Sequence, residues 1–160
     1  MSEKIFDIKV CIERCLDDMG LNYHNDEDDN TFFFSVNRDS TYGPLRMFVI
    51  YYNEAYTVRA VMGNHASASV RSRVGEFLHR ANYGLKNGDF ELDYNDGEVS
   101  YKVHASLPGM APSEESIKRN IATPVAMFDR YGEGIMKVMF SKEKPKVILD
   151  KIEQNDIHQK

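Results

Sequence analysis

A run of four acidic residues at positions 26–29, Asp-Glu-Asp-Asp, could bind a hard cation. Clustered carboxylates suit Ca²⁺, but an EF-hand loop also needs a glycine at its sixth position and a glutamate at its twelfth. Counted from Asp26, those two positions hold Thr31 and Asn37. The run therefore fails the calcium motif, and we expect a solvated hairpin loop instead.

Two cysteines, Cys11 and Cys15, are four residues apart on an expected helix. This spacing is neither a redox Cys-x-x-Cys motif nor a disulfide framework. With the nearby His24 they would supply three zinc ligands, whereas a structural zinc site needs four. We therefore expect no metal and no cofactor, and we interpret both cysteines as small hydrophobic residues.

No sequence motif for catalysis is present among the serines, which lie outside any Gly-x-Ser-x-Gly elbow or Ser-x-x-Lys arrangement. Residues 63–65, Gly-Asn-His, lack the glycine spacing and the lysine of a phosphate-binding loop. We therefore do not expect an enzyme. An acid–base pair assembled in space from distant residues stays open as an alternative.

The overall composition is that of a globular domain with one core: 160 residues, 42% apolar and 28% charged. No apolar run approaches the roughly 18–20 residues of a membrane-spanning helix. The net charge of −5 disfavours nucleic acid as a partner, because phosphate binding needs the opposite sign. The N-terminal residues lack the basic start and apolar core of a signal peptide, and with only two thiols we expect a cytoplasmic protein.

Apolar residues at helical spacing predict a first helix from about Ser2 to Met19. Ile8, Ile12 and Leu16 share its apolar face. Phe6 and Val10 point away from that face, which makes them candidates for contact with a partner.

Five strands and a central helix follow. The strands are expected over Phe32–Asn37, Arg46–Tyr52, Ala55–Met62, Asp89–Tyr94 and Glu98–Ala105, with Asn22–His24 as a short segment that could pair with the first. The central helix begins near Val70, and its apolar stripe includes Phe77 and Leu78. Asn95-Asp96-Gly97 predicts a tight hairpin between the last two strands.

The C-terminal third is expected to be helical. Ser113 is a suitable N-cap for a third helix, and Pro124 should kink or restart it. A short helix from about Pro145 to Glu153 lies within a helical tail over 141–160. The whole chain, 1–160, is expected to be one domain.

This order of elements predicts an α+β fold with a mainly antiparallel five-stranded sheet and helices on one face, in the order α-β-β-β-α-β-β-α. Several short motifs resemble the YbjN-type family, labelled bacterial sensory transduction regulators, within the type III secretion chaperone-like fold. The matching residues are Asn82-Tyr83, Gly88, Phe90-Glu91-Leu92, Gly97-Glu98-Val99, Tyr101, Asp129-Arg130-Tyr131, Gly134-Ile135-Met136, Pro145, Ile148, Ile152 and Glu153. The resemblance implies the fold and supplies no catalytic residue. Relatives with this fold are small, acidic, dimeric chaperones that bind unfolded segments of secreted proteins.

We therefore expect a non-enzymatic protein-interaction module, a regulatory or chaperone-like binder of another bacterial protein, and a homodimer. A partner peptide would contact aromatic residues of the sheet or a groove beside the first helix. The candidate contact residues are Phe6, Val10, Phe33, Tyr51 and Tyr52. The alternative is a small-ligand sensor or unrecognised enzyme with a pocket between the sheet and the third helix near Pro124.

Overall fold

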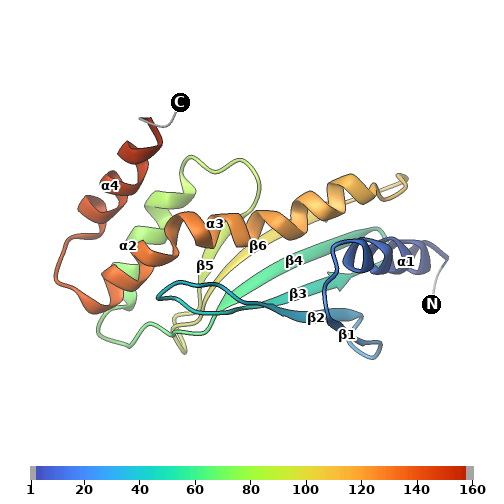
Figure 1. Ribbon diagram of the computed structural model, residues 1–160, viewed down its shortest axis with the longest axis horizontal. Helices are drawn as coiled ribbons and strands as arrows, with labels where there is room; N and C mark the ends of the chain where they lie inside the picture. The colour runs from blue at the N-terminus through green and yellow to red at the C-terminus, as the bar shows by residue number, and fades with distance from the viewer. Residues whose placement is uncertain (1–2, 158–160) are drawn as a thin grey trace.

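The computed structural model describes residues 3–157, and the side chains of residues 7–155 (Figure 1). Its strands are β1 Tyr23–Asp26, β2 Thr31–Val36, β3 Leu45–Tyr51, β4 Ala55–Met62, β5 Asp89–Leu92 and β6 Val99–Ser106. Its helices are α1 Glu3–Asp18, α2 Arg71–Asn82, α3 Glu114–Phe140 and α4 Pro145–Ile157. None of the helices within residues 3–157 is long and apolar enough to cross a membrane.

All six strands form one antiparallel sheet in the order β1-β2-β3-β4-β6-β5. The α+β fold and the antiparallel sheet are confirmed, but the expected count of five strands is one short. The extra strand is β1, whose residues Tyr-His-Asn-Asp pair with β2 from Tyr23 opposite Phe34 to Asp26 opposite Thr31. A polar strand of four residues has too little apolar alternation to be predicted firmly from its sequence.

Alternation along the strands separates a covered face of the sheet from an uncovered one. In β2, Phe32 and Phe34 are buried, whereas Phe33 between them is 39% exposed. The register places Phe34 beside Met47 of β3, so the buried residues of neighbouring strands lie on the same face. Figure 1 shows α1 and α3 lying over this face, where their own apolar residues are buried.

Helix α3 runs for 27 residues and continues through Pro124, so the expected restart of the helix at this proline is wrong. Ser113 caps its first turn as predicted, because the Ser116 N–H donates to the Ser113 hydroxyl oxygen at 3.3 Å. Pro124 is buried within the helix. Proline removes one backbone hydrogen bond, and the many remaining bonds and the burial of the apolar face hold the helix together.

An aromatic cluster joins α3 to the edge of the sheet that β6 and β5 form. The ring of Phe90 in β5 meets Tyr101 of β6 at 4.8 Å, Phe128 of α3 at 5.4 Å and Tyr131 of α3 at 5.7 Å, each nearly edge-on. Such edge-to-face pairs stabilise a core beyond the burial of their area. Phe90 therefore connects β5, β6 and α3 in the core.

The backbone of Phe90 is bound from the other side by a side chain of α2. Asn82 accepts the Phe90 N–H at 2.7 Å and donates to the Phe90 carbonyl oxygen at 2.9 Å. These two groups face away from β6, on the outer edge of the sheet. The Asn82 amide thus takes the place of a neighbouring strand.

Hydrogen bonds hold the loop between β2 and β3 against α3. Arg38 and Tyr42 both donate to the Asp129 carboxylate, the Tyr42 hydroxyl at 2.7 Å. The Tyr42 ring packs on Gly132, where a Cβ would lie 2.4 Å from a ring carbon. Gly132 is therefore needed for close approach and does not end the helix.

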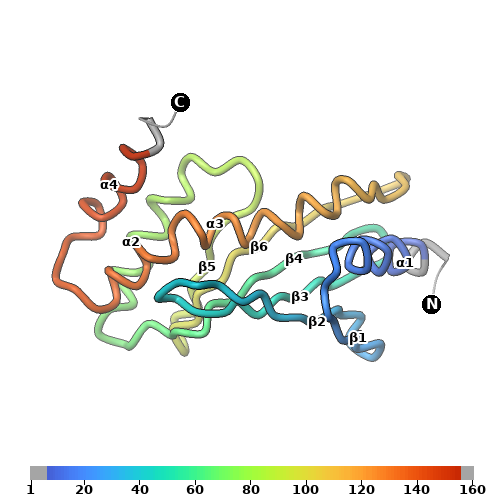
Figure 2. Tube along the Cα trace, viewed as in Figure 1, coloured from blue at the N-terminus to red at the C-terminus, as the bar shows by residue number. Residues whose placement is uncertain are grey.

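At the other end of the molecule, α4 packs against α2 and α3 (Figure 2). Ile148 and Leu149 of α4 are buried. Gly134 of α3 leaves room for this contact, since a Cβ there would lie 2.6 Å from Ile152 and 2.8 Å from Phe77.

Substitution of Gly132 tests the packing of the β2–β3 loop on α3. Alanine in place of glycine within a helix normally stabilises a protein by about 1 kcal/mol. At Gly132 the added methyl overlaps the Tyr42 ring, so Gly132→Ala should lower the free energy of unfolding by about 2 kcal/mol in urea titrations.

Gly75→Ala on α2 is the matched control. Its nearest neighbour is the hydroxyl end of Tyr94, a side chain that is 57% exposed and free to turn aside. This variant should be as stable as the wild type or more stable. A stabilised Gly132→Ala protein would show that Tyr42 is not fixed against the helix.

Candidate partner-binding surfaces

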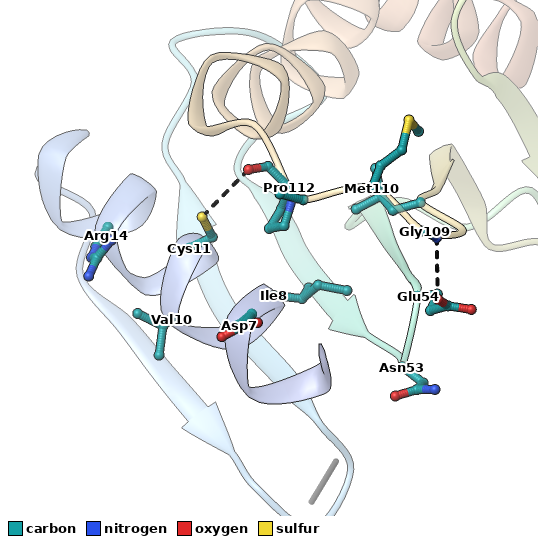
Figure 3. Close-up of a pocket in the computed structure, with 12 residues that line it drawn as sticks. Asp7, Ile8, Val10, Cys11, Arg14, Asn53, Glu54, Gly109, Met110 and Pro112 are labelled. Carbon is teal, nitrogen blue, oxygen red and sulfur yellow. Dashed lines mark hydrogen bonds between the residues drawn. The ribbon is translucent and has the colours of Figure 1, made fainter. Parts of the chain in front are cut away.

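A cleft of about 590 Å³ lies beside α1, at the end of the sheet where β3 turns into β4 (Figure 3). One wall is α1, the second is the β3–β4 turn, and the third is the connection from β6 to α3. The lining residues are Asp7, Ile8, Val10, Cys11, Arg14, Asn53, Glu54, Leu107, Gly109, Met110, Ala111 and Pro112. The sequence places these three walls far apart in the chain, and the fold brings them together.

The cleft residues of α1 are those that helical spacing places on one side of the helix. Asp7, Val10, Cys11 and Arg14 are three and four residues apart, so they project from one side of the helix. The adjacent side carries Ile8, which is 3% exposed and belongs to the core. Val10 is half-buried and faces the cleft.

Hydrogen bonds connect the other two walls, which are the β3–β4 turn and the connection from β6 to α3. The Leu107 N–H donates to the Glu54 carbonyl oxygen at 2.7 Å, and the Gly109 N–H lies 3.4 Å from the Glu54 carboxylate. Across the cleft, the Cys11 thiol lies 3.9 Å from the Pro112 carbonyl oxygen, as Figure 3 shows. The cleft is therefore largely formed before any partner binds.

The middle of the cleft is apolar and contains no activated nucleophile among the residues described there. Burial raises the pKa of Cys11, and nearby Glu114 raises it further. Burial also raises the pKa of Cys15, one turn further along α1, to about 11. Both thiols are protonated near neutral pH, so neither is an activated nucleophile.

The uncovered face of the sheet carries a second apolar surface. Phe33 of β2 and Phe48 of β3 are directly opposite in register, and their ring centres are 5.4 Å apart. Ile50 is half-buried on the same face. Tyr52, which directly follows β3, is 44% exposed, and its ring lies 6.4 Å from that of His104. We call Phe33, Phe48 and Ile50 the sheet-face patch.

Ion pairs occupy the other half of this face. Glu98 lies 3.5 Å from Arg46 and 3.4 Å from Arg59. Glu91 lies 4.0 Å from Arg59 and also pairs with Lys102. The charges are interleaved across four strands, which keeps this half of the face solvated and limits the patch to β2 and β3.

The predicted contact residues divide between these surfaces. Val10 lines the cleft, and Phe33 and Tyr52 are exposed on or beside the sheet-face patch. Tyr51 requires a correction: its side chain is 1% exposed, and its ring lies 5.4 Å from Phe32 in the core. Phe6 lies in α1, but its side chain is outside the described residues.

Tyr51 is buried because the short turn between β3 and β4 places it opposite a core residue of β4. Tyr51 is directly opposite Tyr56, and opposed residues in antiparallel strands point to the same face. The alternation of Tyr56, Val58 and Ala60 predicts the core for that face. Extending the pairing across the turn would therefore have placed Tyr51 in the core from sequence alone.

An apolar groove of about 300 Å³ lies close to Pro124, where the sequence left open a ligand pocket. Phe34, Val36, Ile121 and Val125 contribute to it. Asp129 is the titratable group among its lining residues, and that carboxylate already accepts hydrogen bonds from Arg38 and Tyr42.

One pair resembles a nucleophile and a base. The Thr57 hydroxyl lies 2.9 Å from His104 Nδ1 on the uncovered face. Thr57 is only 7% exposed, so a substrate could not reach its oxygen easily. The pair satisfies a buried hydroxyl and is a poor candidate for catalysis.

Comparison with known proteins gives the fold class. The sequence matches no family model and no curated protein sequence. By structure, the chain is similar to YbjN from E. coli, with a TM-score of 0.50, 16% identity, and 92% of this chain and 90% of that chain covered. It is also similar to a chain of the HopA1–SchA chaperone–effector complex, with a TM-score of 0.51, 12% identity and coverage of 81% and 95%.

A chain of the ExsC–ExsE complex matches equally well, with a TM-score of 0.50, 12% identity and coverage of 82% and 94%. This protein therefore has the type III secretion chaperone-like fold. Within that class, YbjN is among the structures it resembles, as the motifs in its second half predict.

The raised pKa values of the cysteines predict slow thiol chemistry. Near neutral pH we expect the thiol reagent DTNB to modify the folded protein roughly tenfold more slowly than free cysteine, because the thiolate is the reactive form. Cys11 should react before Cys15, since Cys11 is half-buried and Cys15 is fully buried.

The measurement is the absorbance of the released thiolate over time, with Cys11→Ser and Cys15→Ser variants to assign the two phases. Unfolding in guanidinium should equalise the rates. A fast phase assigned to Cys11 in the folded protein would contradict the burial described here.

Proposed function

We propose that this protein is a non-enzymatic protein-binding module that holds a segment of a partner protein in the cleft beside α1. The single observation that carries the proposal is the cleft itself: three braced walls around an apolar centre, with charged side chains at the rim. This composition is typical of binding sites, in which apolar residues supply affinity and a few polar groups fix orientation.

The cleft suits a short extended segment. Asp7 and Arg14 are seven residues apart on α1, which corresponds to about 10 Å along a helix axis. An extended chain advances about 3.3 Å per residue, so roughly three or four partner residues would follow this wall. Alternate side chains of such a segment would point into the cleft and away from it.

The structural neighbours support a protein partner. Two of the similar structures are complexes, and one is described as a chaperone with its effector. By analogy of fold, we propose a regulatory or chaperone-like role toward another bacterial protein. Its identity depends on side chains in the cleft, which the fold does not determine.

A second candidate function is the sensing of a small apolar ligand. The groove near Pro124 favours it, because this groove lies between α3 and β2 and its lining is almost entirely apolar. The groove has few polar groups to give a ligand orientation, whereas the cleft has several. The cleft is therefore the stronger site.

The test is selection of peptides from a phage-displayed random library on the immobilised protein. We expect the wild type to enrich peptides that bind with micromolar affinity in fluorescence anisotropy. Val10→Asp, which places a charge on the apolar wall, should weaken their binding at least tenfold, because desolvating a carboxylate costs more than about 1.4 kcal/mol.

The matched control is the double variant Phe33→Ser, Tyr52→Ser, which removes exposed aromatic rings from the uncovered face and leaves the cleft intact. Its peptide affinity should equal that of the wild type. Loss of binding in this variant, with binding retained by Val10→Asp, would move the site to the sheet-face patch. Circular dichroism checks that each variant is folded.

The homodimer expected from the sequence stays a prediction, and it bears on the same surface. A dimer formed through Phe6 and Val10 would cover the cleft. Under the present proposal, light scattering at several concentrations should give the same mass for the wild type and Val10→Asp. A dimer that this variant converts into a folded monomer would place α1 at a subunit interface and contradict the proposal.

A further inference from the structure

We infer that the β2–β3 loop, residues 37–44, is a strap that detaches from α3 as a unit while the rest of the fold stays intact, and that Asp129 and Glu133 hold it closed. The strap is separate from the cleft beside α1, so this inference does not depend on the proposed function. It concerns a conformational change, and it bears on the apolar groove near Pro124.

The strap has its own internal structure. Backbone pairing between β2 and β3 ends with Val36 opposite Leu45, on either side of the strap. Within the strap, the Gly43 N–H donates to the Ser40 carbonyl oxygen at 3.1 Å. Gly43 has a φ of 70°, a backbone conformation that other residues rarely adopt, and it turns the chain back toward β3. The strap is therefore a compact turn that the sheet anchors at its two ends.

Two carboxylates of α3, one turn apart, hold the strap closed. Arg38 donates to both oxygens of Asp129, with its Nε 2.8 Å from Oδ1, and the Tyr42 hydroxyl donates to the same carboxylate. Glu133 accepts hydrogen bonds from the Thr41 hydroxyl and from the Thr41 N–H, the latter at 2.8 Å. These two hydrogen bonds hold the pKa of Glu133 below its usual range, so this carboxyl is ionised near neutral pH. Hydrogen bonds to ionised groups are stronger than those between neutral groups.

The attachments lie where water can replace them. The side chain of Asp129 is 40% exposed and that of Arg38 is 34% exposed. Segments held by solvent-accessible hydrogen bonds open at a lower free energy than the core of a protein. Tyr42 is the buried anchor of the strap: it is 2% exposed, packs on Gly132, and its ring lies 6.1 Å from that of Phe128. One buried ring and a few exposed hydrogen bonds therefore oppose the opening.

Opening of the strap lengthens the apolar groove near Pro124. Val36 lines this groove and directly precedes the strap. On α3, Val125 lines the groove, and Gly132, which the Tyr42 ring covers, lies two turns further along the same side of the helix. The surface beneath Tyr42 is therefore continuous with the groove, and the closed strap limits the length of the groove.

The experiment is amide hydrogen exchange, followed by NMR on the full chain in increasing but sub-denaturing urea. The Gly43 N–H reports on the strap. We expect its exchange to require a smaller free energy than global unfolding and to change little with urea, because a local opening exposes little surface. The most protected amides of β3 and β4 should exchange through global unfolding and accelerate with urea. The same free energy and urea dependence at Gly43 would mean that the strap detaches only when the whole protein unfolds, and would overturn the inference.

The variant Asp129→Asn with Glu133→Gln tests the attachments. The neutral amides keep the shape of the side chains and weaken the hydrogen bonds to the strap, so exchange at Gly43 should accelerate about tenfold or more. The acceptor of the Gly43 N–H, the Ser40 carbonyl oxygen, is unchanged in this variant. An unchanged rate at Gly43 would overturn the inference.

The matched control is Glu115→Gln with Asp150→Asn. It removes the same charge from carboxylates of α3 and α4 that pair with Arg119 and Lys146, away from the strap. Exchange at Gly43 should equal that of the wild type. An acceleration as large as that of the Asp129→Asn, Glu133→Gln variant would mean that overall charge, and not attachment of the strap, sets the rate, and it would also overturn the inference.

Discussion

The burial of one sheet face beneath the unbroken helix α3 is the constraint on which the rest of this structure depends. Six strands present a wide apolar face, and α3, a helix of 27 residues, crosses it beside α1. Its buried residues include Phe128 and Tyr131, which close over Phe90. Removal of this apolar area from water is the main favourable contribution to such a fold.

The path of the chain into α3 creates the candidate site. β6 ends at Ser106 and α3 begins at Glu114, so a short connection must lead from the sheet to the start of the helix. That connection passes beside α1 and is held by the β3–β4 turn through Glu54. The connection that leads the chain from the sheet to α3 thus also forms one wall of the cleft.

Local patterns predicted much of the fold. The spacing of Ile8, Ile12 and Leu16 identified the buried side of α1, and Asn95-Asp96-Gly97 identified the hairpin between β5 and β6, with Gly97 at a φ of 82°. These features depend on neighbours in the sequence, so they can be recognised there. The continuation of α3 through Pro124 could not be predicted in this way, because burial of the surrounding helix outweighs the lost hydrogen bond.

The candidate site was only partly predictable for a related reason. Val10 could be recognised as an apolar residue outside the apolar face of α1, and this position indicated a groove beside the helix. Asp7 and Glu54 carried no signal, because only the tertiary structure brings both into the lining of one cleft, and they are separated by 46 other residues. Single carboxylates at such a distance are indistinguishable from ordinary surface charges.

The Asn82 side chain has a consequence for how this sheet can associate with others. Its amide already occupies the N–H and carbonyl of Phe90, the groups through which a further strand would join at β5. A strand added beside β5 would have to displace this side chain, so one asparagine disfavours extension of the sheet at that edge.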